Sequence, residues 1–141
     1  MSLTSYFIED LKAGMEAACE RTVTEADIAA FAAVSGDDNP VHLDEAFAAQ
    51  TDFKGRIAHG LLTASYISAV IGTRLPGPGA IYLSQSLRFM APVRIGDTVR
   101  AVVRVIHLDP RRRRARLACF CHVGANLVLE GEANVKVPSR G

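Results

Sequence analysis

Asp37 and His42 place a carboxylate and an imidazole within the short run Asp37-Asp38-Asn39-Pro40-Val41-His42. Pro40 fixes its own φ and disfavours the α conformation at Asn39, so we expect a loop that does not continue a preceding helix. A stiff loop of this kind can bring both polar groups to one point, where they could hold a water molecule and act on it as acid and base. The same residue types also occur in ordinary Asx-Pro turns.

A second candidate is the segment Ile57-Ala58-His59-Gly60, which precedes an apolar stretch. We expect residues 61–72 to form a helix that is hydrophobic on nearly every face and therefore buried. Gly60 would lie at its N-terminus, where backbone N–H groups are unpaired, and the missing Cβ would let a ligand oxygen approach them. This arrangement could stabilise an oxyanion. Alternatively, Gly60 is only a cap and His59 an ordinary loop histidine.

These segments form part of a longer pattern that resembles a known family. The pattern consists of Phe31-Ala32-x-x-Ser35-Gly36-Asp37-x-Asn39-Pro40-x-His42-x-Asp44, Ile57-Ala58-His59-Gly60 and Ser86-Leu87-Arg88-Phe89-x-x-Pro92-Val93-x-x-Gly96-Asp97. It is similar to the MaoC-like dehydratases, and most similar among them to the (R)-specific enoyl-CoA hydratases, from about Tyr6 to Val137. The resemblance implies an α+β hot-dog fold, in which an antiparallel β-sheet wraps a long central helix, and a homodimer. It also implies addition of water to a trans-2-enoyl-CoA, giving an (R)-3-hydroxyacyl-CoA.

The resemblance also implies roles for individual residues. Asp37 would act as general base toward a water, His42 would orient that water and handle the proton destined for the α-carbon, and the Gly60 amide would stabilise the thioester oxygen. Asn39 would fix the loop or the water, and Ser68 stands where the family has a serine beside the catalytic pair. Further substrate-binding candidates are His59, Leu61, Leu62 and Tyr66. We expect no metal and no separate cofactor, since coenzyme A is part of the substrate.

Other activities fit the same residues. A 3-hydroxyacyl-[acyl-carrier-protein] dehydratase would run the reverse reaction on a different carrier. A hot-dog thioesterase would direct the water at the thioester carbonyl, and a metal hydrolase would use Asp37, His42 and His59 as ligands. A non-catalytic acyl-thioester-binding dimer is disfavoured because both members of the acid–base pair are present.

Composition is compatible with these hypotheses. The chain has 141 residues, of which 49% are hydrophobic, and we expect a single domain over residues 1–141. The net charge of +1 gives no reason to expect a nucleic-acid partner, and no apolar run approaches the roughly 20 residues that cross a bilayer. The first residues do not resemble a signal peptide. Cys19, Cys119 and Cys121 match no disulfide framework or zinc spacing, which favours a cytoplasmic location.

Periodicity and turn residues give the expected order of elements. Thr24 and Asp27 resemble a capping box before a helix that ends near Gly36, and Asp44 can cap a helix over residues 45–50. The strand candidates are residues 16–21, 80–89, 98–107, 115–123 and 127–137. Short connections between the later strands favour an antiparallel meander.

Two further runs carry charge or sulfur. Arg111-Arg112-Arg113-Arg114 would either bind the phosphates of coenzyme A or form a solvated hairpin tip. Cys119-Phe120-Cys121-His122 lies in a predicted strand, where alternate residues face opposite sides, so we do not expect it to bind a metal.

Overall fold

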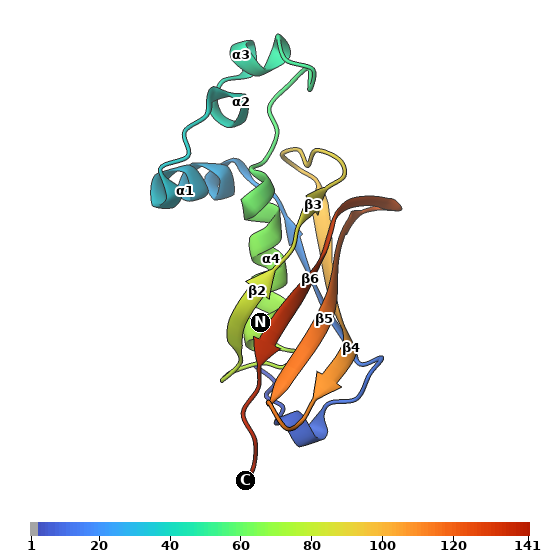
Figure 1. Cartoon of the computed structure of the whole chain (residues 1–141). Helices are drawn as coiled ribbons and strands as arrows, with labels where there is room; N and C mark the ends of the chain where they lie inside the picture. Colours follow the sequence, from blue (N-terminus) through green and yellow to red (C-terminus); the bar gives the residue numbers. More distant parts are fainter. Residues whose placement is uncertain (1–2) are drawn as a thin grey trace.

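The computed structural model describes residues 3–141, and in this part of the chain a six-stranded antiparallel sheet packs against a long helix (Figure 1). The strands are β1 (Glu16–Thr22), β2 (Ile81–Gln85), β3 (Arg88–Phe89), β4 (Thr98–Asp109), β5 (Arg114–Val123) and β6 (Asn126–Lys136). The helices are a 3-10 turn (Ile8–Asp10), α1 (Glu25–Ser35), α2 (Pro40–Leu43), α3 (Glu45–Ala49) and α4 (Gly60–Thr73). A sheet wrapped around one central helix is the arrangement expected for the hot-dog fold.

The strand order is β1-β4-β5-β6-β2, and β3 also pairs with β6. The consecutive strands β4, β5 and β6 form the predicted antiparallel meander. The strands that precede them lie at the two edges, because β1 pairs with β4 whereas β2 pairs with β6. Along β6 the predicted alternation is confirmed: Leu129, Ala133 and Val135 are buried, while Glu132 is exposed.

The expected strand over residues 80–89 is wrong in one respect, because it is broken into β2 and β3. Both pieces pair with β6, but the ladder is irregular between Tyr82 and Ser84. At the break, the Ser86 carbonyl oxygen approaches the β6 backbone so closely that a Cβ on Gly131 would lie 1.8 Å from it. Gly131 therefore permits a close backbone approach that sets where β3 begins.

Local capping explains where α1 and α3 begin. The Thr24 side chain accepts from the Asp27 amide and the Asp27 side chain accepts from the Thr24 amide, and α1 ends at Gly36 with a left-handed φ of 78°. The Asp44 side chain accepts from the Phe47 amide at the start of α3. These predictions are confirmed.

The expected loop over the Asp37 to His42 run is wrong at its end, since His42 lies in the one-turn helix α2. Pro40 occupies the first helical position, where its fixed φ suits the helix and its missing N–H costs nothing. The Asn39 side chain accepts from the Val41 amide at 3.1 Å and so caps this turn. Asn39 thus fixes the segment, which is one of the two roles predicted for it. The other role, fixing the water, stays a prediction.

Helix α4 buries one face against the sheet, and the prediction that it is buried on nearly every face is wrong. The buried residues are Leu62, Thr63, Tyr66, Ile67, Val70 and Ile71. The opposite face carries Leu61, which is 58% exposed, and both Ser65 and Ser68 are exposed. The sheet covers only the face that it curves around, so the small and apolar residues on the other face remain uncovered in the single chain.

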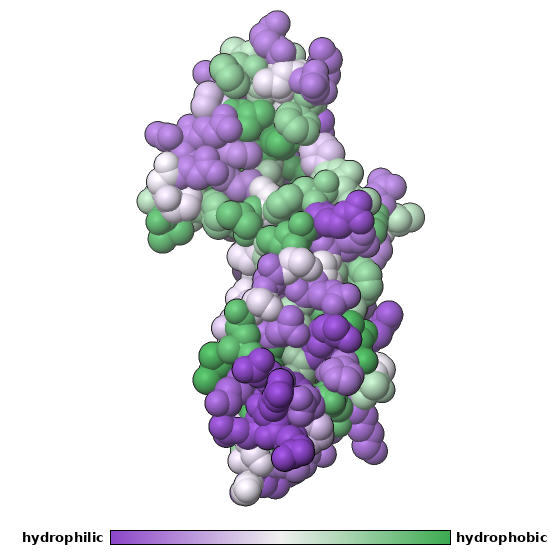
Figure 2. Space-filling model, in the orientation of Figure 1, coloured by the Kyte–Doolittle hydropathy of each residue, from purple (hydrophilic) through white to green (hydrophobic). Residues whose placement is uncertain are grey.

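Arg111, Arg112 and Arg113 lie in the exposed turn between β4 and β5, and Arg114 begins β5, at the opposite end of the sheet from α2 and α3 (Figure 1). In Figure 2 hydrophilic surface dominates this end of the molecule. The run is therefore the predicted hairpin tip. Over residues 3–141 no helix has the length and apolar character that crossing a membrane requires.

We predict that Gly131→Ala destabilises the protein by about 1–3 kcal/mol, the usual cost of forcing an atom into a packed site, because the new methyl group meets backbone that cannot rotate away. Urea unfolding curves measure this free energy. The control is Glu132→Ala in the same strand, where the side chain is exposed and makes an ion pair with Arg116. Equal unfolding midpoints for the two variants would contradict the close approach of Ser86.

Candidate active site

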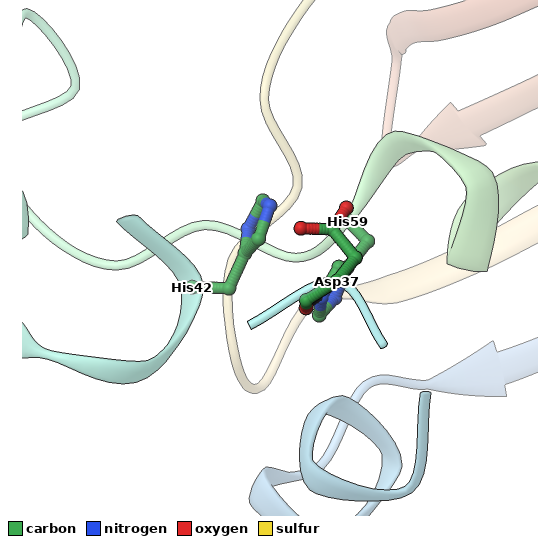
Figure 3. Close-up of side chains that lie close together, drawn as sticks. All are labelled: Asp37, His42 and His59. Atoms are coloured by element: carbon green, nitrogen blue, oxygen red, sulfur yellow. Dashed lines mark hydrogen bonds between the residues drawn. The ribbon is translucent and has the colours of Figure 1, made fainter. Parts of the chain in front are cut away.

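Asp37, His42 and His59 are brought together at the end of the sheet where α4 begins (Figure 3). One ligand-type atom from each residue lies within 4.8 Å of the corresponding atoms of the other two. Asp37 follows α1, His42 belongs to α2, and His59 immediately precedes α4. The structure therefore brings Asp37 and His42 together, and His59 lies beside them; their roles as an acid–base pair stay a prediction.

Asp37 is positioned by the turn that ends α1. Its amide donates to the Ser35 hydroxyl at 3.1 Å, and one of its carboxylate oxygens accepts from the Asn39 amide at 3.3 Å. The residue is exposed, so its carboxylate has access to a ligand or to water. Its backbone carbonyl accepts from His59 Nε2 at 2.9 Å.

His42 is buried, and its protonation pattern follows from one contact. Its Nδ1 lies 2.8 Å from the carbonyl oxygen of Ile57. A carbonyl oxygen only accepts, so Nδ1 carries the hydrogen, and in the neutral ring Nε2 keeps a lone pair. Burial lowers the pKa of His42 below its usual 6.5, and the neighbouring His59 adds to this, whereas the Ile57 hydrogen bond and the Asp37 carboxylate oppose it.

Two arginines hold the backbone of the site region, one at His42 and the other at Phe53 after α3. Arg56 Nε donates to the His42 carbonyl at 2.7 Å, and Arg56 Nη1 contacts the Glu25 carboxylate of α1 at 2.6 Å. Arg94 Nη2 donates to the Phe53 carbonyl at 2.5 Å. These contacts tie α1, α2 and the segment after α3 to one another through side chains rather than through a shared sheet.

A cavity of about 480 Å³ adjoins the cluster. Of the predicted site residues, Asp37, His59, Gly60 and Leu61 line it. Leu62 and Tyr66 instead belong to the hydrophobic core. Ser68 is exposed on α4 and does not line the cavity. In the single chain, the cavity therefore includes part of the predicted site, and Ser68 stays apart from it.

Gly60 is the first residue of α4, as predicted, with His59 as its N-cap. A Cβ on Gly60 would lie 2.6 Å from Phe89 Cε1, so the ring of Phe89 covers this position closely. The first amides of a helix have no acceptor within the helix and point toward its N-terminal end, and Gly60 is one of the residues that line the cavity.

Several lining residues were not predicted as site residues. They are Phe53, Ile57, Ala58, Thr63, Phe89, Met90, Ala91, Pro92, Val93, Val128 and Leu129. They come from α4, β3, β6 and the segments on either side, and most are apolar, so each alone looks like a core or surface residue. The one sequence signal was the Phe89 to Val93 stretch, which forms part of the family pattern. The cavity wall is thus suited to an apolar ligand with one polar end near Asp37.

The stacked geometry of the two histidines bears on the metal hypothesis. Their ring centroids lie 3.9 Å apart with an interplanar angle of 27°. A nitrogen lone pair lies in the plane of its ring, so nearly parallel stacked rings direct their lone pairs side by side rather than toward one ion.

The chain matches known proteins over most of its length. Residues 8–118 match the family described as MaoC like domain. The chain is 58% identical to the 3-hydroxybutyryl-CoA dehydratase of Methylorubrum extorquens, covering 95% of this chain and 85% of that protein. It is 53% identical to the (R)-specific enoyl-CoA hydratase of Rhodospirillum rubrum, covering 99% of this chain and 96% of that protein.

The solved structures agree. The (R)-hydratase from A. caviae involved in PHA biosynthesis superimposes with a TM-score of 0.89 at 46% identity, covering 92% of this chain and 99% of that one. The unliganded R-hydratase PhaJ1 from Pseudomonas aeruginosa gives a TM-score of 0.89 at 45% identity, covering 95% of this chain and 86% of that one. These matches and the placement of Asp37, His42 and Gly60 lead to one conclusion: the chain belongs to the MaoC-like dehydratase family.

Proposed function

We propose that this protein is an (R)-specific enoyl-CoA hydratase, which adds water to a trans-2-enoyl-CoA to give an (R)-3-hydroxyacyl-CoA. The main support is that the Asp37 carboxylate lies close to the His42 ring beside the start of α4, while only Nδ1 of that ring is bound to the Ile57 carbonyl. Relatives named as hydratase or CoA dehydratase at 53% and 58% identity support the same reaction in its two directions.

In the proposed mechanism, one water donates a hydrogen bond to the Asp37 carboxylate and a second hydrogen bond to His42 Nε2. Its oxygen attacks the β-carbon while the proton accepted by Nε2 passes to the α-carbon; the other hydrogen stays on the new hydroxyl. Because Nε2 carries no proton at the start, His42 can only deliver a proton that it has first taken from the water. The thioester oxygen gains negative charge during attack, and the Gly60 amide stabilises it.

The proposed reaction needs no metal or other cofactor, because the thioester itself accepts the electrons of the addition. The stacked histidine rings support this proposal. A cytoplasmic location is proposed because Cys19, Cys119 and Cys121 are free thiols in the structure. Burial raises the pKa of Cys119 to about 11 and that of Cys121 to about 12, which suits inert core thiols.

The decisive experiment is hydration of crotonyl-CoA, measured with and without a chelator and followed by chiral analysis of the product. We expect the (R) product at the same rate in both samples. Release of free coenzyme A would indicate a thioesterase, and no turnover of the thioester would indicate a binding protein. Loss of activity in chelator would contradict the metal-free mechanism.

We further propose a homodimer that joins the β2 edges of two sheets. Ile81 and Leu83 of this edge strand are 56% and 44% exposed, so β2 presents apolar side chains beside unpaired backbone groups. The other edge, β1, carries the exposed charges Glu16, Glu20 and Arg21, which discourage pairing. A symmetric contact through β2 would also lie beside the uncovered face of α4.

Asp37→Asn and His42→Ala should each lower kcat by about 10²–10⁴-fold, because the first removes the negative charge of one acceptor of the water and the second removes the other acceptor. The double variant should lose little more than either single variant, since the two groups act as a unit. Asp38→Asn is the matched control: it is the next carboxylate in the chain, is exposed and lies outside the cluster. Activity in both single variants equal to that of the control would remove the pair from the mechanism.

The acid limb of kcat/KM should lie below pH 6.5, because the lowered pKa of His42 keeps Nε2 unprotonated until the pH falls further. Activity is present above this limb and is lost as the pH falls through the folded-state pKa. NMR titration of the His42 ring measures the pKa directly, with the urea-unfolded chain as reference near 6.5. A folded-state pKa above the unfolded value would contradict the assigned burial effect.

Gly60→Ala should lower kcat strongly, by about 10²-fold or more if the amide is the oxyanion donor. The new Cβ would also push Phe89, so the matched variant is Gly60→Ala combined with Phe89→Ala, which removes the clash. We expect the double variant to stay impaired, because the methyl group still shields the amide. Recovery of wild-type kcat in the double variant would show that only the displaced ring mattered.

Light scattering should give a mass of about twice 15.1 kDa at micromolar concentration. Leu83→Arg should shift the protein toward monomer, because it places a charge in the proposed contact. Glu20→Arg on the β1 edge is the control and should leave the mass unchanged. A monomeric wild-type protein, or a stronger effect of Glu20→Arg, would overturn the proposed interface.

A further inference from the structure

We propose that His59 is a positioning residue that holds both Asp37 and His42 in the geometry needed to bind the water, an inference that rests on the proposed function. His59 contacts each of them through a different part of its ring. Its Nε2 donates to the Asp37 backbone carbonyl at 2.9 Å, and its ring face stacks on His42 at 3.9 Å between centroids. One side chain thus joins the two halves of the acid–base pair.

The local chemistry of α4 does not explain a histidine at this position. His59 is the N-cap of α4, yet its side chain makes no capping hydrogen bond. Asp, Asn, Ser or Thr there would satisfy a helix amide, and a buried polar atom without a partner costs free energy. His59 is only 2% exposed, and its Nδ1 is buried without a hydrogen-bond partner among the described residues. The residue type breaks a local rule at the point where it contacts Asp37 and His42, which is typical of a functional position.

The hydrogen bond to Asp37 constrains the segment that carries the carboxylate. Asp37 is exposed and follows the left-handed Gly36, so little apolar packing fixes its backbone. The His59 bond ties that backbone to the first turn of α4, which is anchored in the core. The carboxylate is therefore held at a fixed distance from the Gly60 end of the helix.

The ring stack constrains His42 in a second way. With its Nδ1 bound to the Ile57 carbonyl and its face covered by His59, the His42 ring has a fixed plane and presents Nε2 in one direction. His59 also contacts Phe31 of α1, with ring centroids 4.8 Å apart. Phe31 is uncharged.

The ionisable groups that act on His42 are few. From the segment after α1, Asp37 favours the protonated ring, and from the start of α4, His59 disfavours it. From the segment before α4, the Ile57 carbonyl accepts from the ring. Arg56 is satisfied by the His42 carbonyl and Glu25. Removing His59 therefore removes both cover from His42 and a neighbour that disfavours its protonated ring.

Two substitutions separate the two contacts. His59→Phe keeps an aromatic face against His42 but has no donor for the Asp37 carbonyl, whereas His59→Gln keeps an N–H donor of similar reach but has no ring. We expect kcat to fall about 100-fold in His59→Phe, the scale of a displacement of roughly 1 Å, and less in His59→Gln. We expect the acid limb of kcat/KM, and the NMR titration of His42, to move to higher pH, and further in His59→Gln than in His59→Phe.

The matched controls are His107→Phe and His107→Gln, made at an exposed histidine of β4 outside the site. Melting temperatures are measured on the same samples. If both His59 variants melt lower but keep wild-type kcat and an unmoved acid limb, His59 is merely structural and the proposal is overturned. A drop in kcat with no movement of the His42 titration would overturn the stacking role.

The inference can still be tested if one variant fails to fold or if the wild-type protein shows no hydratase activity. If His59→Phe does not fold, His59→Gln and its His42 titration decide the outcome alone. If the wild-type protein does not hydrate crotonyl-CoA, the proposed function fails, while the NMR titration of His42 in the variants still tests whether His59 positions that ring.

Discussion

The packing of α4 against the curved sheet is the contact on which the site depends. Ile67 and Val70 are fully buried on the face that meets the strands, so the helix cannot slide or rotate without exposing them. Its first turn is consequently fixed at one end of the sheet, beside β3 and β6. A helix start held in this way offers backbone amides at a set position, with no side chain needed to place them.

The acid–base groups are held by a different kind of interaction. Apolar burial fixes α4, but Asp37 and His42 are placed by hydrogen bonds: they accept from Asn39, Arg56 and His59, and His42 Nδ1 donates to the Ile57 carbonyl. Hydrogen bonds are directional, so they can specify which nitrogen of His42 carries the proton. Apolar packing cannot make that distinction. The apolar core thus positions the helix start that carries the proposed backbone donor, whereas a polar network positions the proposed side-chain acceptors.

Most elements could be predicted from the sequence, because alternation and capping are local signals. The break at Ser86 could not, since it depends on Gly131 in a strand far along the chain. The exposed stripe of α4 was missed because a helix with small and apolar residues all round does not reveal which face the sheet will cover. The pair of Asp37 and His42 was predicted, but the contact of His59 with both required the fold to bring α2 and α4 together. The apolar cavity wall was also missed, because its residues come from separate segments that only the fold brings together.

The bridge made by Arg56 has a consequence for how the protein loses structure. Residues 36–57 bury few apolar side chains, and Phe47 and Phe53 lie partly on the surface, so this segment relies on contacts such as those from Arg56 to Glu25 and to the His42 carbonyl. Regions with little buried apolar surface open at lower free energy than the core. The segment should therefore behave as a separate cooperative unit that opens in hydrogen exchange while the sheet stays closed. The chain can then be inactive and still largely folded.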